Sequence, residues 1–319
     1  MKITVIGTGR WGSFIAWYLN HIGKDVTLYG RESSKKFQEF KNTKSNGLIE
    51  IPESLKLSSD LDNVIDSEVI VVSVGAQNFR DLMKQLQEYK LKNKIFVLCM
   101  KGIEIASTER LSQIAEQYLD YTNRVAVWLG PGHVQEFYKG VPNCMVIDSK
   151  DENCKEYLVK EFSSSLIRFY YGNDLLGNEI GAAAKNVIGI AAGVLDGLGL
   201  SSLKGALMSR GTREVSRLIE KMGGNPLSAY GLCHLGDYEA TVFSEFSHNR
   251  RFGEMMAKKE TFDKLAEGYF TSKAMMKLKE KYNVELPITE AVYNACYLNK
   301  DPKLEIESLF LRSIKHEFA

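Results

Sequence analysis

The chain has 319 residues, of which 44% are hydrophobic and 25% charged, and its formal net charge is +1. This composition is sufficient for two domains with hydrophobic cores, and the nearly balanced charge gives no indication of a nucleic-acid-binding surface. The five cysteines form no C-x-x-C pair and no metal-ligand spacing, so we predict a reduced, cytoplasmic protein without a metal site.

The first predicted element is a buried parallel strand at residues 3–6, which begins so early that no signal peptide is expected. Gly7, Gly9 and Gly12 follow at the G-x-G-x-x-G spacing, and residues 11–19 carry apolar side chains at helical intervals. Between a strand and a helix, such glycines allow a tight turn, the approach of a pyrophosphate and close helix packing. We therefore predict dinucleotide binding; the alternative is an ordinary glycine turn.

The second predicted strand, residues 25–29, ends where an NAD-binding fold places an acid for the ribose 2′-hydroxyl. Gly30 and Arg31 stand there instead, with Lys35 and Lys36 close behind. An arginine can hold a 2′-phosphate through two hydrogen bonds, which favours NADP(H) over NAD(H). The alternative is that these cations belong to a solvated loop.

Further strands are predicted at 68–74, 94–99, 124–129, 144–148 and 166–171, with helices at 79–89 and 107–118. This alternation predicts an α/β fold with a doubly wound, Rossmann-type sheet. From about Gly177 only helical patterns remain, so we expect a dinucleotide-binding domain at 1–174 and an all-α substrate domain at 175–319. The longest apolar region, residues 187–203, contains Asp196 and several glycines, which indicates a buried helix rather than a membrane span.

Ligands of doubly wound sheets bind beyond the carboxyl ends of the strands, so the residues after each strand are candidate site residues. Lys101 follows one predicted strand, and the segment from Gly130 to Gly132 follows the next. Lys101 is a cation beside Gly102, at a position where a ligand could come close. The alternative is a loop lysine that faces water.

A second lysine stands out in the sequence NEIGAAAKNVIGIAAGVLDG. On a helix, Lys185 shares one face with Gly181, Gly189 and Asp196, so small residues surround its ammonium group. Desolvation and neighbouring cations can bring a lysine pKa into the range in which it exchanges protons near neutral pH. We predict a general acid/base; the alternative is a snorkelling lysine on a closely packed helix.

A third cluster follows in GLCHLGDYEA and FSEFSHNRRFG, where Asp237 follows a glycine. Ser247, His248 and Asn249 precede two arginines, and together they offer hydroxyl, imidazole, amide and guanidinium donors to an anionic substrate group. A polar helix-capping loop is the alternative explanation.

Across almost the whole chain, the motifs GTGRWG, CMKGIE, GPGHVQE, GNEIGAAAKNVIGIAAGVLDGLG, GALMSRGTREV, GLCHLGDYEAT, SHNRRFG and AEGYFTS occur in this order. In these motifs the sequence resembles the NAD(P)-dependent glycerol-3-phosphate dehydrogenase family. Two positions depart from the family pattern, which usually has serine at position 132 and arginine at position 248.

The resemblance implies roles for individual residues. Lys185 is the implied general acid/base of a hydride transfer between NAD(P)H and dihydroxyacetone phosphate. The implied substrate-binding residues are Lys101, Gly130, Gly132, Asp237, Ser247, His248 and Asn249. The implied cofactor-binding residues are Gly7, Gly9, Arg10, Trp11, Gly12, Arg31, Phe79, Lys101, Val134, His248, Arg250 and Glu267.

The expected product is sn-glycerol 3-phosphate for glycerophospholipid synthesis, and the expected assembly is a homodimer without stable membrane insertion. Two alternatives stay open. One is a reductase of another small phosphorylated or carboxylated ketone, for which His248 and Gly132 are the motivating residues. The other is a nucleotide-sensing binding protein without catalytic activity.

Overall fold

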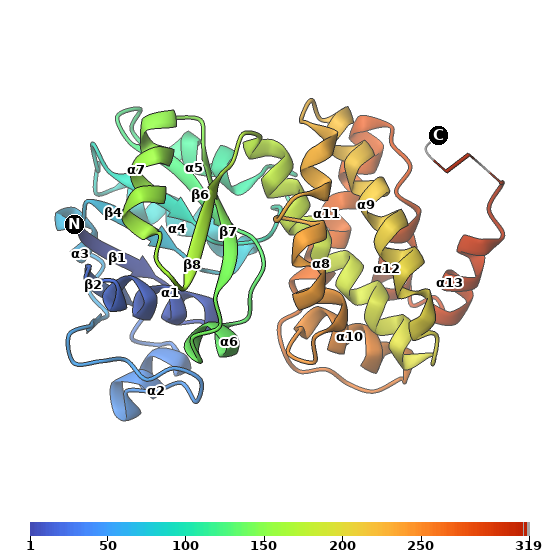
Figure 1. The fold of residues 1–319 in the computed structure, drawn as a ribbon, viewed down its shortest axis with the longest axis horizontal. Coiled ribbons are helices and arrows are strands. Elements are labelled where there is room, and N and C mark those ends of the chain that lie inside the picture. Colours follow the sequence, from blue (N-terminus) through green and yellow to red (C-terminus); the bar gives the residue numbers. More distant parts are fainter. Residues whose placement is uncertain (315, 318–319) are drawn as a thin grey trace. The chain divides into compact units, whose positions relative to one another are not determined.

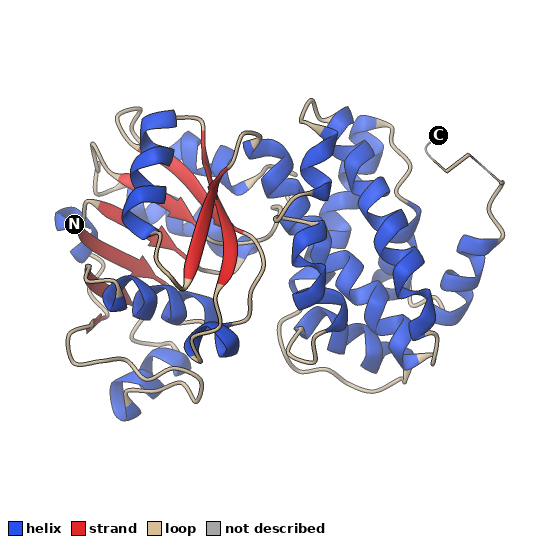
Figure 2. Cartoon of the chain, viewed as in Figure 1, coloured by secondary structure: helices blue, strands red, loops and turns tan. Residues whose placement is uncertain are grey.

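The computed structural model describes residues 1–314 and 316–317, and the chain divides into two compact units (Figure 1). Unit 1 comprises Met1–Glu104 and Glu109–Glu179, and unit 2 comprises Ile105–Thr108 and Ile180–Ala319. In the described residues the β-strands lie in unit 1, whereas unit 2 is built from helices (Figure 2). The units divide inside helix α8 (Leu175–Gly197), whereas the sequence places the domain limit after residue 174.

Unit 1 is organised by one sheet with the strand order β3-β2-β1-β4-β5-β6-β7-β8. All neighbouring strands pair in parallel except β6 and β7, which are antiparallel. The strand order reverses beside β1, so the carboxyl ends of β1 and β4 form the switch point at which such sheets bind ligands. The strands are β1 (Lys2–Ile6), β2 (Asp25–Tyr29), β3 (Lys56–Ser58), β4 (Val69–Val72), β5 (Ile95–Leu98), β6 (Arg124–Leu129), β7 (Asn143–Ser149) and β8 (Ile167–Tyr171).

Helices cover both faces of this sheet, as the predicted fold class requires (Figure 1). Alternate strand residues such as Val5 and Trp128 pack with Phe14 of α1 and Phe162 of α7 in one continuous apolar core. The opposite face carries α4 and α5. The helices of this unit are α1 (Arg10–His21), α2 (Lys35–Thr43), α3 (Asn63–Asp66), α4 (Phe79–Gln87), α5 (Leu111–Tyr118), α6 (Val134–Tyr138) and α7 (Glu152–Phe162).

Two predictions about local structure were wrong. The helix predicted at 107–118 begins only at Leu111, because Thr108 adopts a left-handed φ of 64° and Ile103 pairs with Arg110 in an isolated β-bridge. The short strand β3 was not predicted, since three residues at the edge of a sheet carry too little periodicity to detect.

Unit 2 is built around α8, which is apolar enough to span a membrane by composition, although 89% of its most apolar window is buried inside the structure. The sequence reading of this segment as a core helix is therefore confirmed. Short helical turns and further helices surround α8. They are η2 (Ser201–Leu203), α9 (Lys204–Lys221), η3 (Pro226–Tyr230), η4 (Leu235–Asp237), η5 (Glu239–Phe243), α10 (His248–Ala257), α11 (Glu267–Tyr282), α12 (Pro287–Tyr297) and α13 (Pro302–Phe310).

Candidate active site

The three glycines of the first turn have three different surroundings. Gly7 has a φ of 123°, and a Cβ built on it would lie 2.1 Å from the carbonyl oxygen of Ser73. A Cβ on Gly12 would lie 2.1 Å from the carbonyl oxygen of Gly7, whereas a Cβ on Gly9 would meet no heavy atom within 4 Å. Gly7 and Gly12 thus permit the turn and its packing, and Gly9 leaves open space at its surface.

The open space lies at the N-terminus of α1, where Gly9 is the N-cap residue. No side chain caps this helix, and its first turn carries no acidic residue. Its first N–H groups and the positive end of its dipole are therefore suited to a phosphate group. These features fit a dinucleotide whose pyrophosphate lies over Gly9.

Side chains after β5 and β6 lie close to this turn. Lys101 donates a 2.7 Å hydrogen bond from Nζ to the carbonyl oxygen of Gly130, and its ammonium lies 5.9 Å from the ring centroid of Trp11. The structure thus brings Trp11, Lys101 and Gly130 together at one edge of the sheet. This is the edge at which the sequence predicts the cofactor.

Gly132 has a φ of 139°, and a Cβ on it would lie 2.1 Å from the ring of Phe137. The aromatic ring therefore fills the space that a side chain at position 132 would need, which is a physical reason for glycine here.

Three other residues of this unit were assigned to the cofactor, and each begins a helix. Arg10 is the first residue of α1 and is half-buried, whereas Phe79 and Val134 are the buried first residues of α4 and α6.

The end of β2 has no room for an acid. A Cβ on Gly30 would lie 2.6 Å from side-chain atoms of both Phe37 and Thr8. The nearest carboxylate, Glu32, accepts hydrogen bonds from Lys41 at 2.7 Å and from a glutamine side chain, which lower its pKa to about 2. Arg31 is exposed, as are Lys35 and Lys36.

In unit 2 the lysine predicted to transfer protons lies in a buried ion pair. Nζ of Lys185 lies 2.6 Å from Oδ2 of Asp237 and donates a 2.8 Å hydrogen bond to Oγ1 of Thr241. Thr241 in turn donates to the backbone carbonyl of Asp237 at 2.7 Å. Lys185 is 7% exposed and Asp237 is fully buried, so the ammonium is held in a fixed place with little water around it.

A buried histidine joins the helix of Lys185 to the turn of Asp237. Nδ1 of His234 lies 2.8 Å from the carbonyl oxygen of Gly181, and Nε2 lies 2.7 Å from the hydroxyl of Tyr238. Since a carbonyl only accepts, Nδ1 carries the proton, and Nε2 of the neutral ring accepts from Tyr238. Burial lowers the pKa of His234 to about 4, which keeps the ring neutral.

The glycine stripe of α8 has a structural explanation. A Cβ on Gly193 would lie 1.8 Å from the carbonyl oxygen of Arg250, and one on Gly197 would lie 2.6 Å from that of Glu254. Gly189 faces Thr241 in the same way. The small residues thus let α10 and η5 pack directly on α8. They are therefore no evidence for proton transfer, and that assignment depends on the Lys185–Asp237 pair.

The polar cluster at the start of α10 also contacts α8 and α11. Nδ2 of Asn249 donates to Oδ1 of Asn186 at 3.0 Å, and Oδ1 of Asn249 accepts from the backbone N–H of Gly268 at 2.9 Å. Ser247 is the N-cap of α10, as the capping alternative predicts, and Nδ1 of His248 lies 3.2 Å from the carbonyl oxygen of Leu265. Asn249 thus links the helix of Lys185 to the start of α11, which is Glu267.

Arg250, which the sequence assigns to the cofactor, lies in an ion-pair network. Its Nη1 is 2.6 Å from Oδ2 of Asp196, which also binds Lys204 at 2.7 Å. Burial tends to raise the pKa of Asp196, but hydrogen bonds from Lys204, Ser201 and Arg250 outweigh it and lower the pKa. Arg250 therefore ties α10 to the end of α8. In the described residues, no group of three or more His, Cys, Asp or Glu side chains could hold a metal ion.

Two models of one protein family match most of the chain. The model of the NAD-dependent glycerol-3-phosphate dehydrogenase N-terminus matches residues 2–155, and that of the C-terminus matches residues 174–307. The chain belongs to the NAD-dependent glycerol-3-phosphate dehydrogenase family. The predicted resemblance, the enzyme class and the dependence on NAD(P) are thereby confirmed.

Relatives of this dehydrogenase family match the chain over its full length. The chain is 34% identical to "Glycerol-3-phosphate dehydrogenase [NAD(P)+]" of Thermoanaerobacter sp. and 35% identical to the protein of that name from Clostridium botulinum, with 99% of each chain covered in both cases. A crystal structure of glycerol-3-phosphate dehydrogenase from Coxiella burnetii superposes with a TM-score of 0.91 at 26% identity, covering 98% of this chain and 99% of that one.

Three residues of the candidate site were assigned no role from the sequence. Thr241 lies four residues after Asp237, a spacing that places both on one side of a helical turn, and this spacing could have identified it. Asn186 follows Lys185 directly but gave no signal of its contact with Asn249. One partner of His234, Tyr238, lies four residues later, a spacing that could have linked the two residues, whereas its other partner, Gly181, is 53 residues away.

Proposed function

We propose that this chain catalyses the reduction of dihydroxyacetone phosphate to sn-glycerol 3-phosphate with a nicotinamide dinucleotide. The observation that carries the proposal is the buried pair of Lys185 and Asp237 on α8 and η4, in a chain of the glycerol-3-phosphate dehydrogenase family. The relatives are named glycerol-3-phosphate dehydrogenase [NAD(P)+], which identifies their substrate and their cofactor.

The cofactor's phosphates would be held by Gly9 and the N-terminus of α1, with Trp11 and Lys101 beside them. When bound, the nicotinamide supplies the hydride that the substrate carbonyl carbon accepts. The space at Gly9 and the uncapped helix end support this assignment, because together they leave room and free N–H groups for a phosphate.

The task of Lys185 is to protonate the substrate oxygen. As the carbonyl oxygen gains negative charge, the Nζ–H bond breaks and an O–H bond forms, which leaves a neutral amine. Asp237 holds Nζ at 2.6 Å and Thr241 holds it at 2.8 Å, so the proton donor is fixed in position. Solvent then returns the proton before the next turnover.

The phosphate end of the substrate is assigned to Ser247, His248 and Asn249. Asn249 is held in place by Asn186 and the backbone of Gly268, which leaves its orientation little freedom. A histidine donates one hydrogen bond when neutral, whereas an arginine presents a fixed fork, so His248 should hold the phosphate less tightly than the family's usual arginine.

We further propose a preference for NADP(H) over NAD(H). Gly30 excludes an acid at the end of β2, and the neighbouring carboxylate of Glu32 is paired with Lys41 at 2.7 Å. Arg31, Lys35 and Lys36 are exposed and cationic. Together they suit the phosphate that only NADP(H) carries.

The family resemblance also supports a cytoplasmic homodimer that binds neither nucleic acid nor a membrane stably. Light scattering after size exclusion would test the assembly, and a mass of twice 36.0 kDa is expected. A single 36.0 kDa species at micromolar concentration would contradict it.

The direct test of the function is the loss of nicotinamide absorbance in the presence of dihydroxyacetone phosphate, compared with a panel of other ketose phosphates and keto acids. We expect the highest kcat/KM with dihydroxyacetone phosphate. A higher value with another ketone would assign the chain to that substrate, and no turnover with any of them would leave only a binding function.

A further inference from the structure

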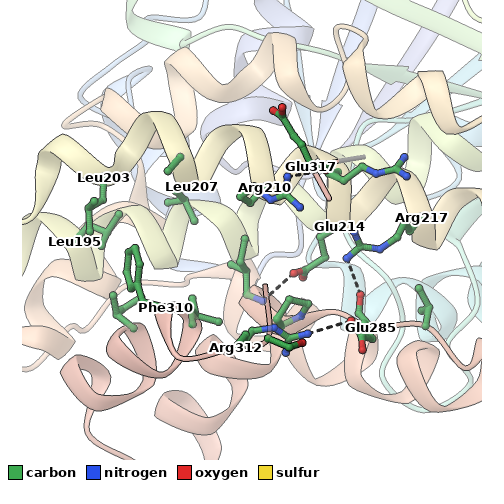
Figure 3. A pocket seen from close by; sticks show the side chains of 18 of the residues that line it. Leu195, Leu203, Leu207, Arg210, Glu214, Arg217, Glu285, Phe310, Arg312 and Glu317 are labelled. Atoms are coloured by element: carbon green, nitrogen blue, oxygen red, sulfur yellow. Dashed lines mark hydrogen bonds and ion pairs between the residues drawn. The ribbon is translucent and has the colours of Figure 1, made fainter. Parts of the chain in front are cut away.

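A cavity of about 750 Å³ lies in unit 2, between α9 on one side and α12 and α13 on the other (Figure 3). Its volume is in the range of sites that bind small molecules, roughly 300–1,000 Å³. None of the residues that line it is assigned to the substrate or the cofactor. Leu195, which lines it, lies ten residues after Lys185 on α8, or about 15 Å along the helix axis.

The two ends of this cavity differ in chemistry, as Figure 3 shows. One end is apolar, with Leu195 and Leu207 buried in its wall and Phe310, 65% exposed, at its edge. The other end carries Arg210 and Arg217 of α9, together with further charged side chains. A ligand that fits both ends must itself have an apolar part and a polar part.

The charged end is dominated by a row of guanidinium groups. Arg210, Arg213 and Arg217 are spaced by three and four residues on α9 and therefore lie on one face of that helix. Arg210 donates to the carbonyl oxygen of Glu317 at 2.9 Å, and Arg217 donates to that of Glu285 at 3.2 Å. These two backbone acceptors carry no net charge, so neither bond neutralises the arginine that donates it.

Two acids at this end are already engaged elsewhere. Glu214 accepts from the backbone N–H groups of Ile288 and Thr289 at 2.8 and 3.0 Å, which caps the start of α12. The carboxylate of Glu285 accepts from Arg312 at 3.0 Å. The remaining acids of the lining are Glu220 and Glu317, and the cations outside the row are Lys221 and Arg312. The lining therefore carries five cations against four acids, an excess of one positive charge.

The positive charges of the row also oppose one another. Burial lowers the pKa of Arg217, and the charges of Arg213 and Arg210 lower it further, whereas the charges of Glu214 and Glu285 act to raise it. Like charges held this close cost free energy, and an anion placed among them would relieve that cost. Arginine binds carboxylates and phosphates well because its planar fork matches their oxygens.

We propose that this cavity binds a single-chain amphiphile with an anionic head group. The aliphatic chain lies among Leu195, Leu207 and Phe310, and the head group accepts hydrogen bonds from the arginine row of α9. A fatty-acid carboxylate and an alkyl phosphate share this chemistry. The proposal does not depend on the substrate of the enzyme, because the site uses none of the same residues.

The test is isothermal titration calorimetry of the full chain below the micelle concentration of each probe. We expect saturable binding at one site per chain for dodecanoate or dodecyl phosphate, and the tighter of the two identifies the head group. Dodecanol should bind at least tenfold more weakly, and inorganic phosphate should show no binding, because each lacks one half of the required chemistry.

Variants locate the site. Arg210→Gln should lower the affinity for the more tightly bound of the two anionic probes by about tenfold, which is the effect of losing one charged hydrogen bond. Ala206→Trp adds bulk to the exposed wall of α9 and should also lower this affinity. The control Arg168→Gln removes an exposed arginine in unit 1 and should leave the affinity unchanged. All three variants should keep the wild-type circular dichroism spectrum.

Three results would overturn the proposal. Binding of dodecanol as tight as that of the anions would mean that the arginines do not select the ligand. Unchanged affinity in both Arg210→Gln and Ala206→Trp would place the binding elsewhere. Conversion of a dimer to a monomer by Ala206→Trp, in sedimentation velocity, would show that a second copy of the chain covers this face.

Discussion

Acidification should weaken unit 2 through one buried histidine. His234 is fully buried and neutral, with Nδ1 bound to the carbonyl of Gly181 and Nε2 to the hydroxyl of Tyr238. Its pKa falls from 6.5 to about 4, first because of burial, and Lys185 adds to this while Asp237 opposes it. Protonation would place a second N–H against the Tyr238 hydroxyl and a charge where water cannot reach.

The size of this loss of stability follows from the linkage between proton binding and folding. Because the folded pKa lies below the unfolded one, the unfolded chain binds more protons between pH 6.5 and 4. The stabilisation is therefore complete above pH 6.5 and is lost as the pH falls through about 4. A pKa shift from 6.5 to about 4 corresponds to about 3 kcal/mol of folding free energy, at 1.36 kcal/mol for each pKa unit.

Hydrogen exchange of the α8 amides measures the free energy of opening this helix. A local measurement is needed because a chain of two units need not unfold in one step. The comparison is His234→Asn, whose amide can still donate toward Gly181 but does not titrate. The opening free energy of α8 in the wild type should fall by about 3 kcal/mol more than in the variant between pH 7 and pH 4. Parallel pH dependence in the two proteins would refute the reasoning.

Three further predictions concern the site. Gly9→Ala should leave the stability unchanged but weaken cofactor binding, whereas Gly12→Ala should destabilise the chain by about 1–3 kcal/mol. Calorimetric unfolding measures the stability of each variant, and cofactor titration measures its affinity. Arg31→Ala should raise KM for NADPH more than for NADH in steady-state assays, and equal effects would make Arg31 a solvated loop residue. His248→Arg should lower KM for dihydroxyacetone phosphate, and an unchanged KM would mean that His248 does not face the phosphate.

Much of unit 1 could be predicted because its signals are local. The run from Ile3 to Ile6 and the glycines after it lie within ten residues of one another, so strand, turn and helix could be inferred together. The antiparallel pairing of β7 with β6 could not, since the direction of a strand depends on its connection and not on its own residues.

The candidate site in unit 2 was predictable only in part. Lys185 and Asp237 stood out as single residues, but their contact joins positions 52 apart in the chain, and no periodicity carries that information. Gly181 and Gly189 were interpreted as open space around Lys185, whereas a Cβ on them would meet the side chains of His234 and Thr241. Arg250 was assigned to the cofactor from the family resemblance, whereas its pairing with Asp196 appears only in three dimensions.

The most direct test of the central claim is single-turnover oxidation of NADPH with dihydroxyacetone phosphate by the wild type and by Lys185→Met. The methionine keeps most of the side-chain volume and removes the proton donor. We expect the hydride-transfer rate to fall by about 10²–10⁴-fold, while the dissociation constant of NADPH, measured by fluorescence, stays within a factor of two. A variant that reduces dihydroxyacetone phosphate at the wild-type rate would contradict the account, because the proton would then come from a group other than Lys185.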